Sequence, residues 1–319
     1  MKERVLTVLA IVLVVASVLL TKIIVGTSIV FDVLVILLAV AAGFEMSKIL
    51  KNQGKHNNKI LIMAFPVLLF AMLYALMTLH MSILVIGFSV IGLVVLFLLV
   101  GFLWAQVASA STENEMREGK IRTSKSAFAI TKALNTIGGC LYPTFLIMLF
   151  MPINHIADFG YLFGGETSQL ETLSIIMLGL CFAIPFICDT FAYLIGKAVG
   201  GKKLCPKISP KKTISGAIGG VLSTVLLVCV LYLILSSIPS LQLALEAFGL
   251  NWWLVAIVAF VGGIICTIGD LFESFLKRKA NMKDSGDILP GHGGILDRLD
   301  GMIFVVPCVL VFTILLILL

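Results

Sequence analysis

Long runs of apolar residues alternate with short polar segments along the whole chain. Each run is about 16 to 23 residues long, and about 20 apolar residues of helix cross the hydrocarbon core of a bilayer. The pattern therefore predicts about nine transmembrane helices. Their approximate limits are 5–20, 28–43, 60–79, 81–103, 133–151, 173–195, 216–237, 252–272 and 302–319.

The composition excludes an ordinary soluble protein. Of the 319 residues, 60% are hydrophobic and only 13% are charged, which is about half the charge of an average soluble chain. The seven cysteines are sparse, show no metal-site spacing and mostly lie in or beside apolar runs, so we expect small buried hydrophobes. We predict an all-α polytopic membrane domain over 1–319, with N-terminal helices in 1–132 and catalytic helices and loops in 133–319.

The positive charges predict the orientation in the membrane. If the N-terminus is cytoplasmic, 22 of the 23 Lys and Arg residues lie in segments on the cytoplasmic side, and only Lys22 does not. The segment 153–172 on the other side carries three acidic residues and no Lys or Arg. The net charge of +6 therefore reflects topology, and no basic patch carries the stacking aromatics that single-stranded nucleic acid requires. We expect a multi-pass protein of a bacterial cytoplasmic membrane.

A first polar stretch, 188–216, lies between the sixth and seventh predicted spans. It combines six lysines with glycines and hydroxyl residues, a composition that suits a polyphosphate ligand but is also that of an ordinary basic loop. Asp189 lies about two helical turns before Lys197, within the apolar part of the sixth span. Its carboxylate needs a cation or a proton there, so Asp189 is either a site residue or a structural partner of a nearby lysine or tyrosine.

A second polar stretch, 269–300, is denser. Asp270 ends the eighth predicted span, and Asp297 and Asp300 share one helical face at the start of the ninth. Carboxylates beside basic residues are what Mg²⁺ and nucleotide phosphates require, so the stretch predicts phosphoryl or nucleotidyl transfer. Glu273 and Lys277 are expected to form a solvated ion pair between adjacent turns.

These residues resemble a known family. Segments 274–278, 283–286 and 289–300 together look like the signature of the phosphatidate cytidylyltransferases, also called CDP-diacylglycerol synthases. Upstream, 189–196 and 209–213 are similar to a second conserved stretch of that family. The chain departs from the family at Ser215, where an acidic residue is common, and at Phe191, where a small residue is common.

The resemblance implies an activity and a site. The reaction would be CTP plus phosphatidate giving CDP-diacylglycerol and pyrophosphate, dependent on a divalent cation such as Mg²⁺. The family also implies a homodimer. We expect metal ligation by Asp270, Asp297 and Asp300, with Lys277, Arg278 and Asp189 completing the catalytic group. The expected substrate-binding residues are Lys211, Lys212, Thr213, Lys283, Asp284, His292, Gly293, Gly294 and Arg298. His292 could instead be a turn or capping residue.

Two alternatives stay open at this point. A related cytidylyltransferase could act on another lipid phosphate, such as an ether lipid. An ion-coupled transporter could use Asp189 and Asp270 to carry ions, but the polar residues gather at the cytoplasmic side and no continuous polar path crosses the spans.

Overall fold

The computed structural model of the chain describes residue 17 and residues 20–107, 125–163, 166–288 and 293–318. Eight helices in these segments are long and apolar enough to cross a membrane, and each coincides with one of the predicted runs. The prediction of an all-α polytopic membrane protein is therefore confirmed. The first predicted span, 5–20, falls almost wholly outside the described residues, so the count of nine stays a prediction.

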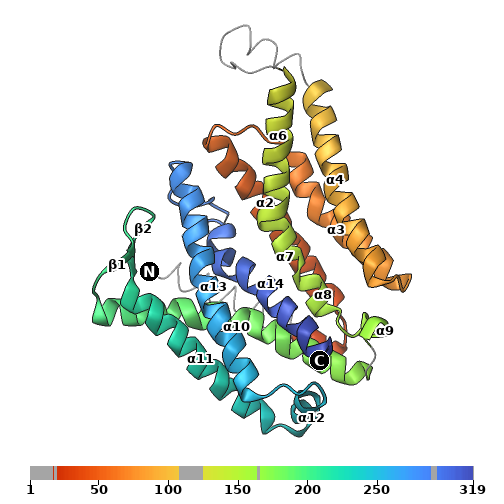
Figure 1. Cartoon of the computed structure of the whole chain (residues 1–319), viewed down its shortest axis with the longest axis vertical. Helices are drawn as coiled ribbons and strands as arrows, with labels where there is room; N and C mark the ends of the chain where they lie inside the picture. Colours follow the sequence, from red (N-terminus) through yellow and green to blue (C-terminus); the bar gives the residue numbers. More distant parts are fainter. Residues whose placement is uncertain (1–16, 18–19, 108–124, 164–165, 289–292, 319) are drawn as a thin grey trace.

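The helices form two neighbouring groups (Figure 1). The first holds α2 (Ile29–Asn52), α3 (Lys59–Thr78), α4 (Ile83–Val107) and α6 (Lys125–Gly139), followed by the π-helical segment η1 (Cys140–Phe145), α7 (Leu146–Met148) and α8 (Phe150–Asn154). After the short α9 (Gly160–Phe163), the second holds α10 (Thr167–Val199), α11 (Ile214–Ser236), α12 (Pro239–Ala247), α13 (Trp252–Lys279) and α14 (Leu296–Leu318). Between α10 and α11 lies an antiparallel hairpin of β1 (Lys203–Cys205) and β2 (Ser209–Thr213).

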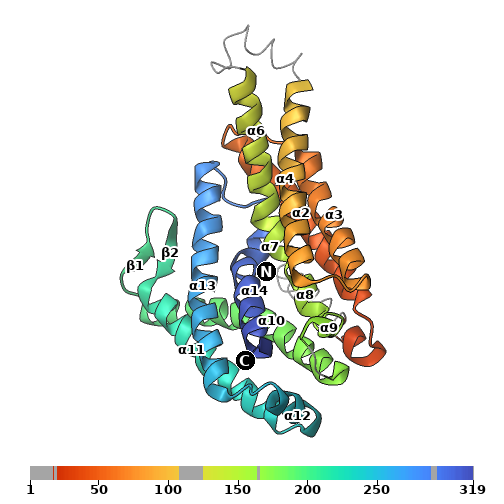
Figure 2. The same ribbon diagram turned by 45° about the vertical axis from the view of Figure 1, so that its right-hand side comes forward.

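The two groups share one hydrophobic core. A connected cluster of buried side chains extends from Phe31 on α2 through Met177 on α10 to Leu316 on α14. In Figure 2, α4 and α6 lie side by side at one edge of the molecule. Only 6% of the most apolar window of α4 is buried, so most of its surface is available to lipid.

One predicted span is broken within its length. The run 133–151 corresponds to α6, η1, α7 and α8 rather than to one regular helix. Tyr142 has extended backbone angles, φ −122° and ψ 120°, directly before Pro143. The proline ring disfavours the helical conformation at the preceding residue and removes a backbone N–H, which explains the break.

Glycines let α13 and α14 cross closely. A Cβ on Gly269 of α13 would lie 2.7 Å from the backbone oxygen of Asp300 on α14. A Cβ on Gly301 would lie 2.6 Å from Cys266 Sγ. Small residues at a helix crossing allow this approach, and here it places Asp270, next to Gly269, beside Asp300.

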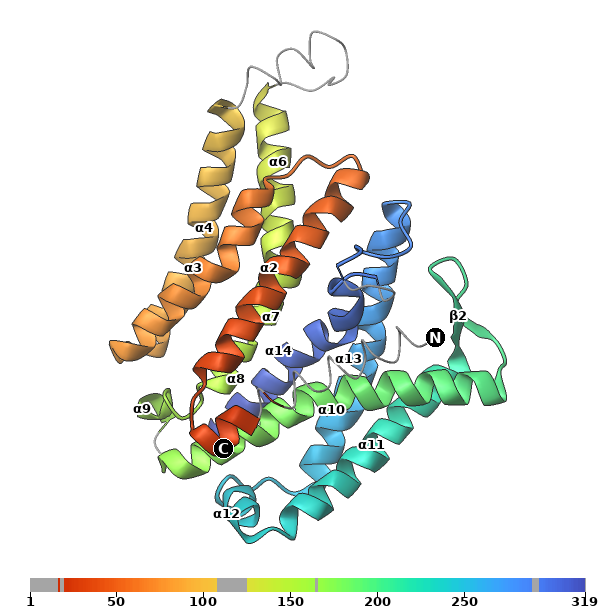
Figure 3. The same ribbon diagram turned by 180° about the vertical axis from the view of Figure 1, so that it is seen from behind.

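A second close crossing joins α10 to α11. A Cβ on Gly216 would lie 2.5 Å from the backbone oxygen of Ala192, and one on Gly220 would lie 2.7 Å from that of Cys188. Figure 3 shows α10 running across the other helices, with the hairpin at its C-terminal end. The crossing therefore brings Asp189, which follows Cys188, and the hairpin toward α13.

A buried polar network lies at the N-terminal end of α2. The imidazole of His155 contacts Asp32 (Nε2 to Oδ2, 2.9 Å) and Asp158 (Nδ1 to Oδ2, 2.5 Å). Lys22 donates to the side-chain oxygen of Asn154 at 2.7 Å and to the Ser174 hydroxyl at 2.7 Å. Charged and polar groups are buried here because they satisfy one another, and the network ties the segment before α2 to α8 and α10.

This network predicts a pH-dependent stability. Burial alone would lower the pKa of His155, but its hydrogen bonds to Asp158 and Asp32 outweigh burial and raise the pKa to about 9. Because folding raises this pKa, the stabilisation is fully present below pH 6.5 and is lost as the pH rises through about 9. We expect the advantage of the wild type over His155→Gln in unfolding free energy to shrink by up to about 3 kcal/mol across that range.

Thermal unfolding in detergent at several pH values measures this difference. Comparison with a variant is needed because burial lowers the pKa of Lys22 to about 8. Lys22 therefore adds stability as the pH rises above about 8, which opposes the His155 effect in the upper part of its window. His80→Gln, a change of an exposed histidine, serves as the matched control. A pH-independent difference between the wild type and His155→Gln would contradict the prediction.

Candidate active site

Charged side chains gather where α13, α14, the hairpin and α10 meet. Lys212 on β2 forms an ion pair with Asp270 on α13. Partial burial would lower the pKa of Lys212. The pKa is nevertheless raised, because the negative charges of Asp270, Asp189 and Asp300 favour the charged ammonium. The fold therefore brings three of the predicted carboxylates around one predicted lysine.

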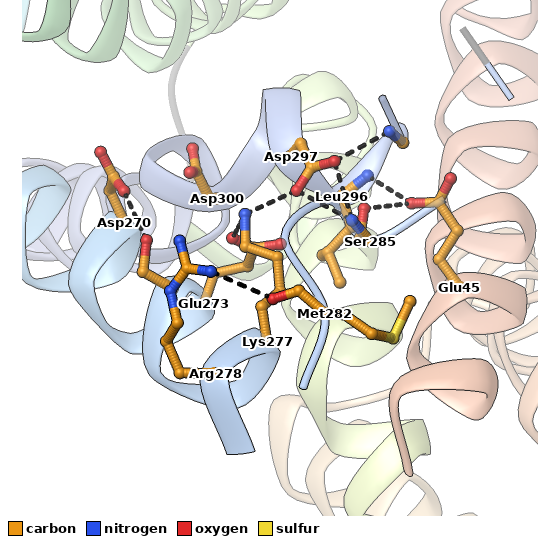
Figure 4. Close-up of polar contacts among 12 residues, drawn as sticks. Glu45, Asp270, Glu273, Lys277, Arg278, Met282, Ser285, Leu296, Asp297 and Asp300 are labelled. Carbon is orange, nitrogen blue, oxygen red and sulfur yellow. Dashed lines mark hydrogen bonds and ion pairs between the residues drawn. The ribbon is translucent and has the colours of Figure 1, made fainter. Parts of the chain in front are cut away.

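The surroundings of these carboxylates leave oxygen atoms available. Asp300 accepts a hydrogen bond from the backbone N–H of Gly301 at 2.7 Å. Asp189 is exposed, and its Oδ1 lies 3.9 Å from the thiol of Cys266, one turn before Asp270 on α13. Figure 4 shows Asp270 and Asp300 on neighbouring helices.

The oxygen donors fit a hard divalent cation. Mg²⁺ is usually held by one or two carboxylates plus water and substrate oxygens, and Asp270 and Asp300, with Asp189 nearby, supply such ligands. Among the described residues, no group of three or more Asp, Glu, His or Cys side chains is arranged so that it could hold a metal ion by itself.

A second charged cluster lies one turn further along α13. The ammonium of Lys277 contacts Asp297 Oδ1 at 2.6 Å and Glu273 Oε2 at 2.5 Å. Glu273 is 0% exposed, so the expectation of a solvated pair is wrong. Lys277 is nearly buried as well, which means that one cation compensates two carboxylates in a poorly hydrated position.

Replacing Lys277 with Met should strongly destabilise the protein. The variant leaves Glu273 and Asp297 without their cation, and removing one partner of a buried ion pair costs about 3–5 kcal/mol. Thermal unfolding in detergent measures the effect, with Lys279→Met, a change of an exposed lysine on the same helix, as the control. Equal unfolding temperatures for both variants would contradict the assignment.

Asp297 holds the loop between α13 and α14. Besides Lys277, its carboxylate accepts hydrogen bonds from the backbone N–H groups of Ser285 at 2.9 Å and Gly294 at 2.8 Å. Together these donors contact both carboxylate oxygens, and Figure 4 shows Lys277 and Ser285 beside Asp297. Asp297 therefore anchors this loop, and its expected role as a metal ligand together with Asp270 and Asp300 stays a prediction.

Gly293 and Gly294 allow the tight packing of this loop. Gly293 has φ +82°, a conformation that favours glycine, and a Cβ there would lie 2.7 Å from Asp297 Oδ2. A Cβ on Gly294 would collide with the side chains of Ser285 and Glu45. Larger residues at either position would displace the loop. His292 lies outside the described residues.

Glu45 on α2 is a site residue that the sequence analysis missed. Its carboxylate is completely buried and accepts hydrogen bonds from the N–H groups of Ile295 (3.0 Å) and Leu296 (2.8 Å) and from the Ser285 hydroxyl (2.9 Å). Figure 4 shows Glu45 reaching this loop from the N-terminal group of helices. A carboxylate at the start of α14 satisfies unpaired N–H groups and complements the helix dipole. The available signal was an acidic residue two positions beyond the end of the predicted span 28–43.

Two other predicted site residues have local structural contacts. The guanidinium of Arg278 donates to the backbone oxygens of Ile208 (3.2 Å) and Met282 (3.3 Å), which ties the hairpin to α13. Thr213 is the N-cap of α11, where its hydroxyl oxygen accepts from the N–H of Gly216 at 3.1 Å. Four more predicted residues have exposed side chains near the cluster: Lys211, Lys283, Asp284 and Arg298.

One of the two departures from the family pattern has a structural explanation. The hydroxyl of Ser215 donates to the backbone oxygen of Gly200 and lies 3.2 Å from the Thr213 hydroxyl. Ser215 therefore joins the start of α11 to the end of α10. Phe191 is half-buried on α10, and nothing in the structure explains the departure there.

The fold defines a multi-pass α-helical membrane protein, and its site groups carboxylates with lysines. A model described as the cytidylyltransferase family matches residues 2–316, so the chain belongs to that family. It is similar to phosphatidate cytidylyltransferases of Staphylococcus haemolyticus, 44% identical over 126 residues, and Staphylococcus aureus, 42% identical over 148 residues. A third relative with that name, from Rickettsia bellii, is 44% identical over 131 residues.

These alignments are partial. They cover 40%, 46% and 41% of this chain and 44%, 52% and 54% of the respective relatives. The chain thus spans about half the length of the curated relatives it matches, although the family model extends over almost its full length.

Proposed function

We propose that the chain transfers a cytidylyl group from CTP to phosphatidate, giving CDP-diacylglycerol and pyrophosphate. The observation that carries this proposal is the grouping of Asp189, Asp270 and Asp300 around Lys212, beside a loop fixed by Asp297 and Glu45. Family membership and the names of the relatives support the same reaction.

The reaction needs no covalent intermediate on the protein. A phosphate oxygen of phosphatidate attacks the α-phosphorus of CTP, the bond from that phosphorus to the oxygen leading to the β-phosphate breaks, and pyrophosphate leaves. Catalysis then depends on positioning and on neutralising charge, as in other phosphoryl transfers. Lys212 supplies a fixed ammonium at the carboxylate cluster, and the exposed Lys211 and Lys283 supply phosphate contacts at its edge.

Asp270 and Asp300, with Asp189, would hold the divalent cation. When bound, the cation neutralises phosphate oxygens and the charge that develops on the leaving pyrophosphate. Lys277 keeps its structural place between Glu273 and Asp297, so the loop that carries Gly293 and Gly294 stays fixed while substrates bind and leave.

We further propose that this site faces the cytoplasm in a bacterial cytoplasmic membrane. The distribution of Lys and Arg supports this orientation. CTP then arrives from the aqueous side, and phosphatidate arrives laterally from the inner leaflet. Cysteines introduced as Lys202→Cys and Asp287→Cys should react with a membrane-impermeant maleimide only after the cells are opened, with the unsubstituted chain as control. Labelling in intact cells would show that these positions face the outside, and the proposed orientation would then be wrong.

The activity is tested with the purified full chain in detergent. We expect pyrophosphate release from CTP and Mg²⁺ that depends on phosphatidate and matches the formation of CDP-diacylglycerol. If pyrophosphate is released with an ether-linked lipid phosphate but not with ester-linked phosphatidate, the lipid substrate is the ether-linked one. No turnover by folded protein with either lipid would overturn the proposal, and substrate-dependent transport in liposomes would then support the transporter.

A further inference from the structure

Tyr142 places a buried hydroxyl beside the carboxylate cluster from a helix outside the predicted site. It lies at the break in η1, where its backbone is extended rather than helical. Its ring packs against Phe272 of α13 and Phe304 of α14, with centroid distances of 4.9 and 5.8 Å. Phe272 precedes Glu273 directly, and Phe304 lies one turn after Asp300, so the ring sits between the two helices that carry the site.

The hydroxyl of Tyr142 has no hydrogen-bond partner within the described part of the chain, although it is buried. The carboxylates of Glu273, Asp300, Asp270 and Asp297 all act on it electrostatically. Leaving a buried hydroxyl unpaired costs free energy, and such a group therefore calls for an explanation. The helix is also irregular at Tyr142, directly before Pro143, so the unpaired hydroxyl and the break in the helix belong to the same residue.

We propose that the Tyr142 hydroxyl donates a hydrogen bond to an anionic phosphate oxygen of the bound substrate. This inference rests on the proposed function and adds a specific ligand-binding group to it. The aromatic contacts with Phe272 and Phe304 fix the ring, so the donor is held in place before the substrate arrives. A phenolic O–H is a neutral donor, so it can contact an anionic phosphate oxygen without adding a further charge to the site.

The structure offers one rival explanation. Both carboxylate oxygens of Glu273 are also buried without a well-formed hydrogen bond, although one of them is ion-paired with Lys277. A water molecule joining Tyr142 to Glu273 would satisfy both groups, and the hydroxyl would then stabilise the protein instead of binding substrate.

Tyr142→Phe separates the two explanations because it keeps the ring and removes only the hydroxyl. We expect the unfolding temperature of the ligand-free variant to match or exceed that of the wild type. Calorimetry with CTP and Mg²⁺, without lipid, should show about 10- to 100-fold weaker binding if the phosphate belongs to the nucleotide. If it belongs to the lipid, CTP affinity stays unchanged and the KM for phosphatidate rises by a similar factor. Tyr232→Phe, on α11 and away from the cluster, is the matched control.

An unchanged CTP affinity together with an unchanged KM for phosphatidate would overturn the inference. If the unfolding temperature of that variant is also lower, the hydroxyl is assigned to a water bridge with Glu273. Turnover by the wild type tests the proposed function separately, so a failure there is distinguishable from a failure of Tyr142 alone.

Discussion

Asp270→Asn should lower turnover of CTP by about a thousandfold while the protein folds normally. The carboxylate faces Lys212 and shares its surroundings with Asp300 and Asp189, so it contributes charge where a cation and phosphates would meet. Removing one preorganised electrostatic group from an active site costs about 10²–10³ in rate, and the loss of a metal ligand belongs at the upper end. Phosphatidate-dependent pyrophosphate release, measured over a range of Mg²⁺ concentrations, gives the effect.

Asp287→Asn is the matched control for this prediction. Asp287 is exposed in the loop between α13 and α14. The control should retain wild-type turnover, and both variants should unfold near the wild-type temperature because Asp270 and Lys212 are only partly buried. A folded Asp270→Asn protein with nearly full turnover would exclude Asp270 from the catalytic group.

Glu45→Ala should destabilise the protein by at least about 3 kcal/mol and also abolish most turnover. The change leaves the N–H groups of Ile295 and Leu296 and the hydroxyl of Ser285 without their shared acceptor, at about 1–3 kcal/mol for each buried donor. The loop that Asp297 also holds would then lose one of its two anchors. Thermal unfolding in detergent and CTP turnover below the unfolding temperature measure the two effects separately.

A graded pair of variants makes this test specific. Glu45→Gln keeps one acceptor oxygen and should recover part of both losses. Glu246→Ala removes an exposed glutamate on α12 and should change neither stability nor turnover. If Glu45→Ala unfolds like the wild type, the buried contacts with the loop do not stabilise it.

The sequence indicated which segments would carry the candidate site, but it did not show which residues of those segments would contact one another. Asp270 and Lys212, which the sequence placed in two separate polar stretches, form an ion pair in the structure. Asp297, expected at a metal, also accepts from loop N–H groups of Ser285 and Gly294, and Thr213, expected at a phosphate, also caps α11. Neither structural role could be predicted from the sequence, because the Asp297 contacts depend on how the loop folds back onto the start of α14.

The sequence by itself determined the spans. The thickness of a bilayer fixes how many apolar residues a spanning helix needs, and the length of each apolar run can be read directly from the sequence. The tertiary structure alone decided which distant residues meet. Gly269 and Gly301 bring Asp270 to Asp300, and the packing of α2 carries Glu45 to a loop about 250 residues away in sequence. Such contacts depend on the fit of complementary helix surfaces, and no local pattern in the chain records which surface will face which.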